Sequence, residues 1–257
     1  MKDTKIQWCD HTFSPWIGCT KVSPGYNNCY AEAYGKRFHC REHCGKTNPR
    51  RRTSAANWKQ PLVWDKAASR LFLPHDTPRV FCGSLCDWLD DEVPIAWLAD
   101  LLALITETPN LDWLLLTKRP ENFQSRLEHV YDGWIAGARH RSLLSRWLER
   151  REPPNNIWIG ATVENQEQSD SRTTELLKIP SKVRFLSCEP LLEAVDLELE
   201  LPDNGAPLGI DWVICGSESG AKRRRMKSEW AISLRAQCAA AGMVVDGKEH
   251  NEFPHAQ

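Results

Sequence analysis

The chain contains no long apolar run and no excess of charge of one sign. Its 33 lysine and arginine residues nearly balance 34 aspartate and glutamate residues, which gives no global reason to expect a polyanionic partner. No stretch approaches the roughly 20 apolar residues that a membrane-spanning helix needs, and the first residues lead into none. We therefore expect a cytoplasmic protein with no membrane partner.

Cysteine, by contrast, is plentiful, with ten residues. The cytosol keeps thiols reduced, so clustered cysteines there indicate metal binding or catalysis. Isolated cysteines such as Cys238 are typical small core residues, and we interpret Cys82 and Cys86 in the same way. The length of 257 residues fits one α/β barrel or two small domains. We favour a single domain over residues 1–257, with a cysteine loop at residues 9–44.

The centre of the chain alternates short apolar runs with longer helical patterns, which predicts βα units around a parallel sheet. The apolar runs are continuous, as in strands that are covered on both faces. We predict strands over residues 79–82, 112–116, 156–160, 182–186 and 211–215. We predict helices over residues 94–107, 121–130, 167–178 and 228–241.

Polar side chains follow each predicted strand. In parallel α/β barrels the carboxyl ends of the strands open on one face and build the active site. A single Ser, Thr or Asn at such a position can also be explained as the N-cap of the following helix. Glu189 and Glu218 are poor N-caps, and burial of a carboxylate without a cation or hydrogen-bond donor costs free energy. The catalytic candidates are Glu189, Glu218 and Lys118; the cofactor-binding candidates are Thr162, Glu164, Asn165, Ser187, Gly216 and Ser217.

Cys19 and Cys29 lie on a turn punctuated by glycine and proline near the N-terminus. Iron–sulfur clusters are held by thiolates, often from one compact loop. A third ligand is needed, and Cys9, Cys40 and Cys44 are within reach in the sequence. Residues 39–44 (HCREHC) form a second group of soft ligands that could instead hold zinc.

Several motifs resemble a phage- and prophage-borne family of uncharacterised proteins, named after phage gene products thirty-seven and sixty-eight. They comprise residues 6–16 (IQWCDHTFSPW), 18–25 (GCTKVSPG), 28–32 (NCYAE), 113–120 (WLLLTKRP), 160–166 (GATVENQ) and 185–191 (FLSCEPL). The resemblance covers nearly the whole chain.

Members of that family look like radical S-adenosylmethionine proteins. The resemblance implies a partial βα barrel, related to the TIM barrel, with a three-cysteine loop after the first strand. Cys19, position 26 and Cys29 would then hold a 4Fe-4S cluster whose open iron binds S-adenosylmethionine, while the protein positions that cofactor and excludes water. No substrate is established for the family.

Position 26 departs from the family pattern, because it is Tyr26 here and a phenolate is an unusual cluster ligand. Two interpretations stay open. The protein is a radical S-adenosylmethionine enzyme that recruits Cys9 or a residue of the Cys40–Cys44 group. Alternatively, it is a catalytically degenerate member that binds zinc or a partner protein.

The C-terminal end also departs from the family pattern. Gly242 leads directly through three apolar residues to Asp246, as if the family's last strand and its loop were missing. We therefore expect the barrel to lack a C-terminal strand and to leave a sheet edge exposed.

Basic residues supply a third class of function. Residues 36–52 and 136–151 are basic segments, for which we weigh a solvated face against a phosphate contact. Lys118, Arg119 and residues 223–225 (RRR) follow predicted strands, so a nucleic-acid partner is compatible with either interpretation.

Overall fold

The computed structural model describes residues 4, 6–29, 31, 40–70, 77–133, 138–198, 209–220 and 222–247. Seven strands form one sheet in which every neighbouring pair is parallel. Their spatial order follows the chain: β1 (His11–Phe13), β4 (Arg79–Cys82), β5 (Asp112–Thr117), β6 (Ile157–Thr162), β7 (Val183–Cys188), β8 (Trp212–Cys215) and β9 (Val244–Gly247). The short strands β2 (Trp16–Ile17) and β3 (Arg51–Arg52) pair antiparallel beside it.

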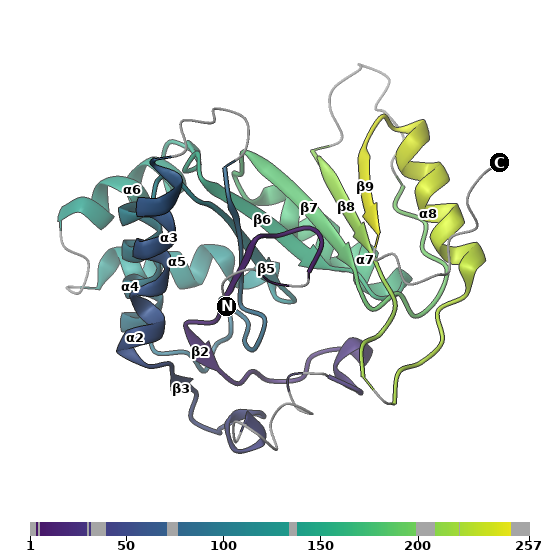
Figure 1. Ribbon diagram of the computed structural model, residues 1–257, viewed down its shortest axis with the longest axis horizontal. Coiled ribbons are helices and arrows are strands. Elements are labelled where there is room, and N and C mark those ends of the chain that lie inside the picture. Colours follow the sequence, from purple (N-terminus) through teal and green to yellow (C-terminus); the bar gives the residue numbers. More distant parts are fainter. Residues whose placement is uncertain are drawn as a thin grey trace.

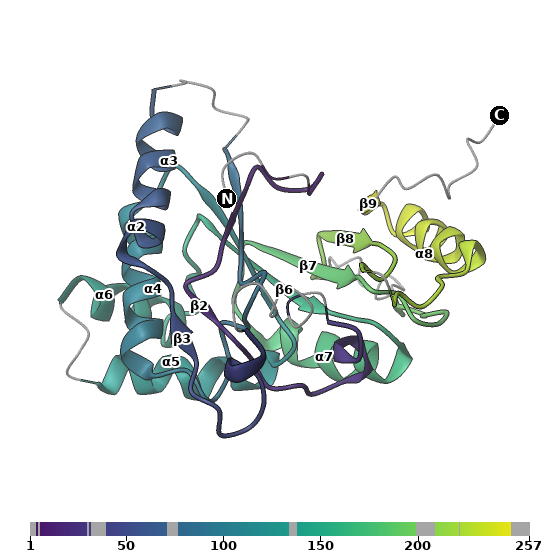
Figure 2. The same cartoon turned by 60° about the horizontal axis from the view of Figure 1, so that its bottom comes forward.

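Helices connect these strands and flank the sheet, as Figures 1 and 2 show. They are α2 (Ala55–Trp58), α3 (Gln60–Ala68), α4 (Ile95–Glu107), α5 (Phe123–Asp132), α6 (Ala138–Leu148), α7 (Gln166–Lys178) and α8 (Ser228–Ala240), with 3-10 turns η1 (Pro24–Tyr26), η2 (Cys40–His43) and η3 (Pro120–Asn122). The predicted alternation of strands and helices is confirmed. No described helix has the length and apolar character to cross a membrane.

The two faces of the sheet bury different sets of side chains, because alternate strand residues point to opposite faces. One face packs its Val, Leu, Ile and Cys side chains against α4 to α8 in a large core. The other face carries a smaller cluster that includes Trp8, Phe81, Phe185 and Trp212. Gly160 belongs to this face: a Cβ there would lie 2.3 Å from a ring carbon of Phe185, so the ring occupies the space of a missing side chain.

The expectation of a missing C-terminal strand is wrong. Gly242 ends α8 in the left-handed region, with φ of +68°, and the chain turns back into β9, which pairs parallel with β8. Valines at 244 and 245 favour a strand because they are β-branched. Among the described residues β1 and β9 pair only with β4 and β8, so the sheet is not closed into a barrel.

The two basic segments are partly structural. In α6 the side chains of Leu144 and Trp147 are buried in the core, so one face of this helix packs on α4 and α5. In the other segment the Arg50 side chain is fully buried and pairs with Asp90 at 2.8 Å. Residues 36–39 and 136–137 of these segments lie outside the described residues.

A cysteine loop over the carboxyl ends of the strands

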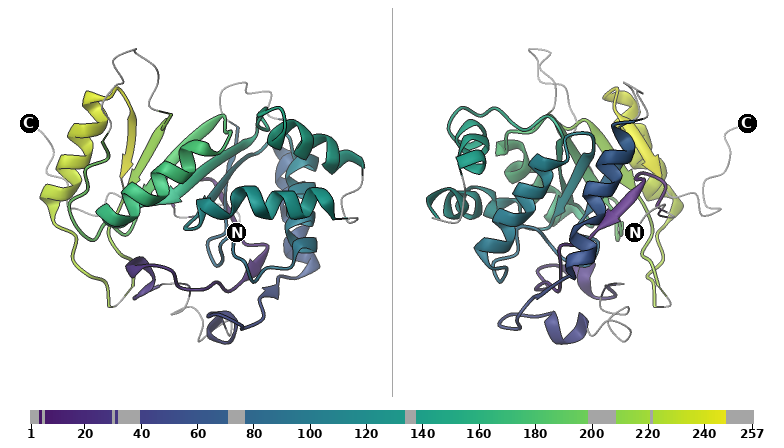
Figure 3. Two further views of the ribbon diagram at one scale, coloured as in Figure 1. Left: turned by 180° about the vertical axis from the view of Figure 1, so that it is seen from behind. Right: turned by 60° about the vertical axis from the view of Figure 1, so that its left-hand side comes forward.

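The loop from Cys19 to Cys29 is fastened to the carboxyl ends of the central strands. The backbone N–H of Gly25 donates to Glu164 Oε1 at 3.1 Å, just beyond β6. Asn28 Nδ2 donates to Glu218 Oε2 at 3.0 Å, just beyond β8. Figures 1 and 3 show this purple segment, which carries η1, running along the edge of the sheet where the strand arrows end. The cysteine loop therefore lies against residues that follow two of the parallel strands.

Glu164 is fully buried and holds the loop through an internal ion pair. Its Oε2 accepts from Arg172 Nη1 at 2.8 Å, and the same Nη1 donates to the Thr162 carbonyl at 2.8 Å. Asn165 begins α7 as its N-cap, accepting from the backbone N–H of Gln168 at 3.1 Å. Glu164 and Asn165 were both expected to bind a cofactor. In the structure Glu164 holds the cysteine loop, and Asn165 caps the N-terminus of α7.

Glu218 sits at the end of β8 and joins the loop to Arg224. The Arg224 backbone N–H and Nε donate to Glu218 Oε2 at 2.6 and 3.1 Å, and Arg224 Nη2 donates to the Pro24 carbonyl at 3.0 Å. Burial by itself would raise the pKa of Glu218, but the hydrogen bonds from Arg224 and Asn28 outweigh it and lower that pKa. Glu218 is therefore ionised near neutral pH.

The other strand-end candidates lie at the same end of the sheet. Ser187 is buried and stands opposite Thr162 in the β6–β7 register. Glu189 lies against Gly216, where a Cβ would come within 3.1 Å of its carboxyl carbon, and Ser217 is half-buried beside it. These residues are neighbours because β7 and β8 pair up to Cys188 and Cys215.

Lys118 faces the cysteine loop directly. Its Nζ donates to Thr162 Oγ1 at 3.1 Å and lies 4.9 Å from the centre of the Tyr26 ring, in a cation–π contact. Arg119, the next residue, is buried and donates to Asp87 Oδ2 at 3.1 Å and to the Thr20 carbonyl. Arg119 therefore anchors the start of the loop from inside the protein, whereas Arg223 and Arg225 are exposed.

Cys19 is the centre of a group of sulfur and phenol side chains. It shares side-chain hydrogen bonds with Cys44 and with Tyr26, and the charge of a Cys29 thiolate would act on it. The hydrogen bond with Cys44, followed by burial and nearby negative charge, raises the pKa of the Cys19 thiol well above its usual range. Burial, followed by the effect of Cys19, raises the pKa of Tyr26. Without a bound cation both groups are neutral.

Cys9 is not brought to this group. It lies before β1, at the amino ends of the strands, and belongs to the buried cluster around Trp8 and Phe81. Burial raises the pKa of its thiol to about 12. Cys82, Cys188, Cys215 and Cys238 are likewise buried in the large core, where each contributes packing.

The HCREHC group gives a mixed result. His39 and the Cys40 side chain lie outside the described residues, and His43 Nδ1 is hydrogen-bonded to the Pro49 carbonyl at 2.8 Å. Within the described part of the chain, no three His, Cys, Asp or Glu side chains are placed to share one metal ion. Zinc binding by this group therefore stays a prediction.

Arg50 and Arg172 escaped sequence reasoning, whereas Asp87 is one of the polar residues that follow the predicted strand at residues 79–82. Asp87 is buried and accepts from Thr117 Oγ1 at 2.7 Å and from the Lys118 backbone N–H at 2.8 Å, so it shapes the strand end that presents Lys118. The sequence does contain a signal from which Arg172 could have been predicted. A glutamate placed directly after a buried strand needs a cation, and Arg172 lies two helical turns further along, in α7.

The fold and this site define a parallel α/β protein that carries a cysteine loop over the carboxyl ends of its sheet. The chain belongs to the family DUF5131, described as a protein of unknown function, whose model matches residues 3–255. This match confirms that the chain is a member of an uncharacterised family. No curated protein and no solved structure matches it.

Proposed function

We propose that the protein is a radical S-adenosylmethionine-type iron–sulfur protein, of phage or prophage origin, with a partial βα barrel. The proposal rests on one observation above all. The loop that bears Cys19 and Cys29 is held over the carboxyl ends of parallel strands by Glu164 and Glu218, through contacts at 3.1 and 3.0 Å. That end of a parallel sheet is where α/β enzymes place their reacting groups.

The donor set fits a cluster in its chemistry. Thiolates are the ligands of iron–sulfur clusters, and Cys19 with Cys29 supplies two from one loop. The Ser23 hydroxyl is buried inside the same loop and has no hydrogen-bond partner, although a buried hydroxyl normally has one. Hydrogen bonds to cluster sulfur atoms tune such centres, so Ser23 offers a donor that the folded chain does not itself use.

When bound, the cluster would supply an electron that splits S-adenosylmethionine into methionine and a 5′-deoxyadenosyl radical. The residues of this chain position the cofactor. Thr162 and Ser187 place hydroxyl groups at the strand ends, and the Glu189 carboxyl group occupies the space beside Gly216. Lys118, whose Nζ donates to Thr162 Oγ1, is a cation at these strand ends, and Glu189 and Glu218 are the candidate carboxylates for proton transfer to a substrate.

A specific observation favours a second candidate function. Tyr26 occupies the middle position of the loop, is buried and is hydrogen-bonded with Cys19, so this position no longer supplies a thiolate. A degenerate member of the family would use the remaining thiols for zinc or the loop for a partner protein. Lys118, Arg223 and Arg225 are basic residues that suit contacts with the phosphates of a nucleic-acid partner. The affinity of the protein for such a partner should fall steeply as the salt concentration rises.

The deciding experiment is anaerobic purification and reconstitution with iron and sulfide, followed by assay of 5′-deoxyadenosine formed from S-adenosylmethionine under reducing conditions. We expect a brown protein that contains iron and sulfide and forms 5′-deoxyadenosine. Cys29→Ser should lose both properties, whereas the control Cys238→Ala, on the buried face of α8, should keep them. A colourless protein without iron refutes the proposal, and stoichiometric zinc without sulfide supports the degenerate member.

A further inference from the structure

The segment that carries Cys44 lies directly against the cysteine loop. The backbone N–H of Gly45 donates to the Cys19 carbonyl at 3.0 Å, and the two thiols, of Cys19 and Cys44, share a hydrogen bond. The two cysteines are 25 positions apart in the sequence but are neighbours in space.

Gly18 makes this close approach achievable. A Cβ at Gly18 would lie 1.9 Å from the His43 carbonyl oxygen, and its φ of +103° is in the region that favours glycine. The backbone before Cys19 therefore touches the backbone before Cys44. Any larger residue at position 18 would push the two segments apart.

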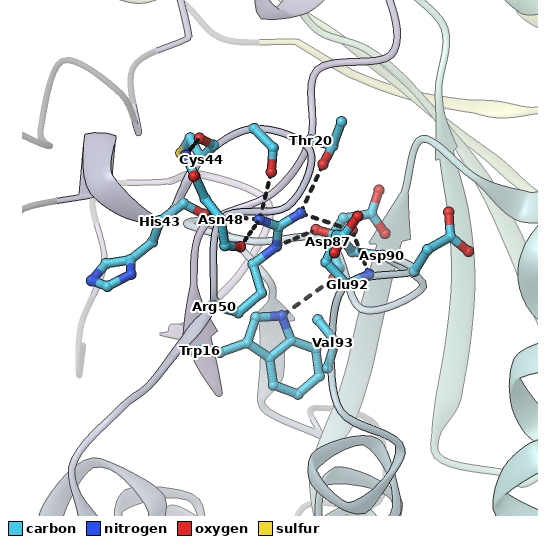
Figure 4. A network of polar contacts seen from close by, with 12 residues as sticks. Trp16, Thr20, His43, Cys44, Asn48, Arg50, Asp87, Asp90, Glu92 and Val93 are labelled. Carbon is cyan, nitrogen blue, oxygen red and sulfur yellow. Dashed lines mark hydrogen bonds and ion pairs between the residues drawn. The ribbon is translucent and has the colours of Figure 1, made fainter.

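A single buried guanidinium then clamps the two segments together. Arg50 Nη1 donates to the carbonyls of His43, Gly45 and Asn48 at 3.1, 2.9 and 2.8 Å, which surround Cys44. Its Nη2 donates to Thr20 Oγ1 at 2.8 Å, next to Cys19. Figure 4 shows the guanidinium at the centre of this network, with the Cys44 segment on one side and Thr20 on the other.

Asp90 fixes the clamp to the body of the protein. Its carboxylate accepts from Arg50 Nε at 2.8 Å and from Nη2 at 3.1 Å in a bidentate pair, with side-chain exposures of 0% and 1%. A fully buried ion pair with this many hydrogen bonds holds one geometry, because each broken contact leaves a polar group unpaired. The position of Cys44 relative to Cys19 is thus built into the fold.

We propose that Cys44 is the third thiolate ligand of the cluster, taking the role that position 26 has lost to tyrosine. This inference rests on the proposed function. It assigns Arg50 as a positioning residue, because that side chain donates to the carbonyls of His43 and Gly45, on either side of Cys44. Tyr26 becomes a packing residue between Cys19 and the Lys118 ammonium.

Four proteins test this assignment: the wild type, Cys44→Ser, Tyr26→Cys and the double variant Tyr26→Cys/Cys44→Ser. Each is reconstituted anaerobically and assayed for iron, acid-labile sulfide and the electron paramagnetic resonance signal of the reduced cluster. Far-ultraviolet circular dichroism and the melting temperature establish that each variant is folded. Cys40→Ser tests the other cysteine of this segment, which the sequence also offers as a third ligand, and Cys238→Ala, in the buried core, is the control.

We expect Cys44→Ser to lose iron and sulfide by about 10-fold or more, while the double variant regains them because a cysteine at position 26 restores a third thiolate. If Cys44 is the ligand, Cys40→Ser should keep the cluster, and the control Cys238→Ala should match the wild type. Full iron content in Cys44→Ser, or its loss in Cys40→Ser instead, overturns the assignment and leaves the proposed function standing. The assignment is also overturned if iron is found only in the two proteins that carry Tyr26→Cys. If none of the four proteins binds a cluster, the proposed function itself has failed.

Discussion

Arg172→Met removes the cation that pairs with Glu164 in the interior. The pair is 2.8 Å apart, and the exposures of the two side chains are 4% and 0%. Removal of one partner from such a pair leaves a buried charge and typically costs about 3–5 kcal/mol. This is a large part of the roughly 5–15 kcal/mol that stabilises a folded domain. We expect the midpoint of urea unfolding to fall accordingly, with little change in the slope of the transition.

A second substitution sharpens this test. In Arg172→Met/Glu164→Gln the buried carboxylate becomes a neutral amide that still accepts from the Gly25 backbone N–H. The double variant should therefore be more stable than Arg172→Met by about 1–3 kcal/mol. Arg146→Met is the matched surface control, since its pair with Glu152 is 58% and 50% exposed and should cost less than about 1 kcal/mol. A double variant no more stable than Arg172→Met would refute our account of how the loop is anchored.

Two further predictions concern packing and pH. Gly160→Ala should lower the free energy of unfolding by about 1–3 kcal/mol, because its methyl group would meet the Phe185 ring at 2.3 Å; Phe185→Leu should relieve part of that loss, and additive effects would contradict the contact. For Glu218, the lowered pKa means that its ionised form stabilises the folded protein above the usual glutamate pKa, and that this contribution disappears as the pH falls through the folded-state value. Urea unfolding should thus show a stability difference between the wild type and Glu218→Gln that is largest at neutral pH and shrinks in acid; a difference that grows in acid would contradict the Arg224 contact.

The central strands and helices could be predicted because their signals are local. Residues 112–116 were expected as a strand, and β5 runs over Asp112–Thr117. The strand ends were placed too early in three cases, by one residue at 116 and by two at 160 and 186, since β5, β6 and β7 continue to Thr117, Thr162 and Cys188. The reason is tertiary: Thr162 pairs with Ser187 across the two strands, a partnership that neither segment shows by itself.

The short strands could not be predicted for a related reason. β1 has three residues, and it is a strand because β4 offers its edge to residues 11–13. β9 has four, and the comparison with a longer family pattern led to the wrong expectation that it was absent. In such short segments intrinsic preference is weak and tertiary context decides.

The sequence predicted which residues lie at the strand ends of the candidate site, but not the contacts between its distant segments. The strand-end rule placed Thr162, Glu164, Ser187 and Glu218 at one edge, and the loop contacts agree with it. What the sequence could not provide is the link between Arg50 and Asp90, 40 positions apart, or the approach of Cys44 to Cys19. Both depend on how two loops fold over each other, for which periodicity carries no signal.

The most direct test of the central claim is the iron and acid-labile sulfide content of the anaerobically reconstituted wild type, measured beside the double variant Cys19→Ser/Cys29→Ser. The account predicts about four iron atoms and four sulfides per wild-type chain, as in a 4Fe-4S cluster, and almost none in the variant. Equal and negligible iron in both proteins would contradict it, and the loop would then be the remnant of a cluster site.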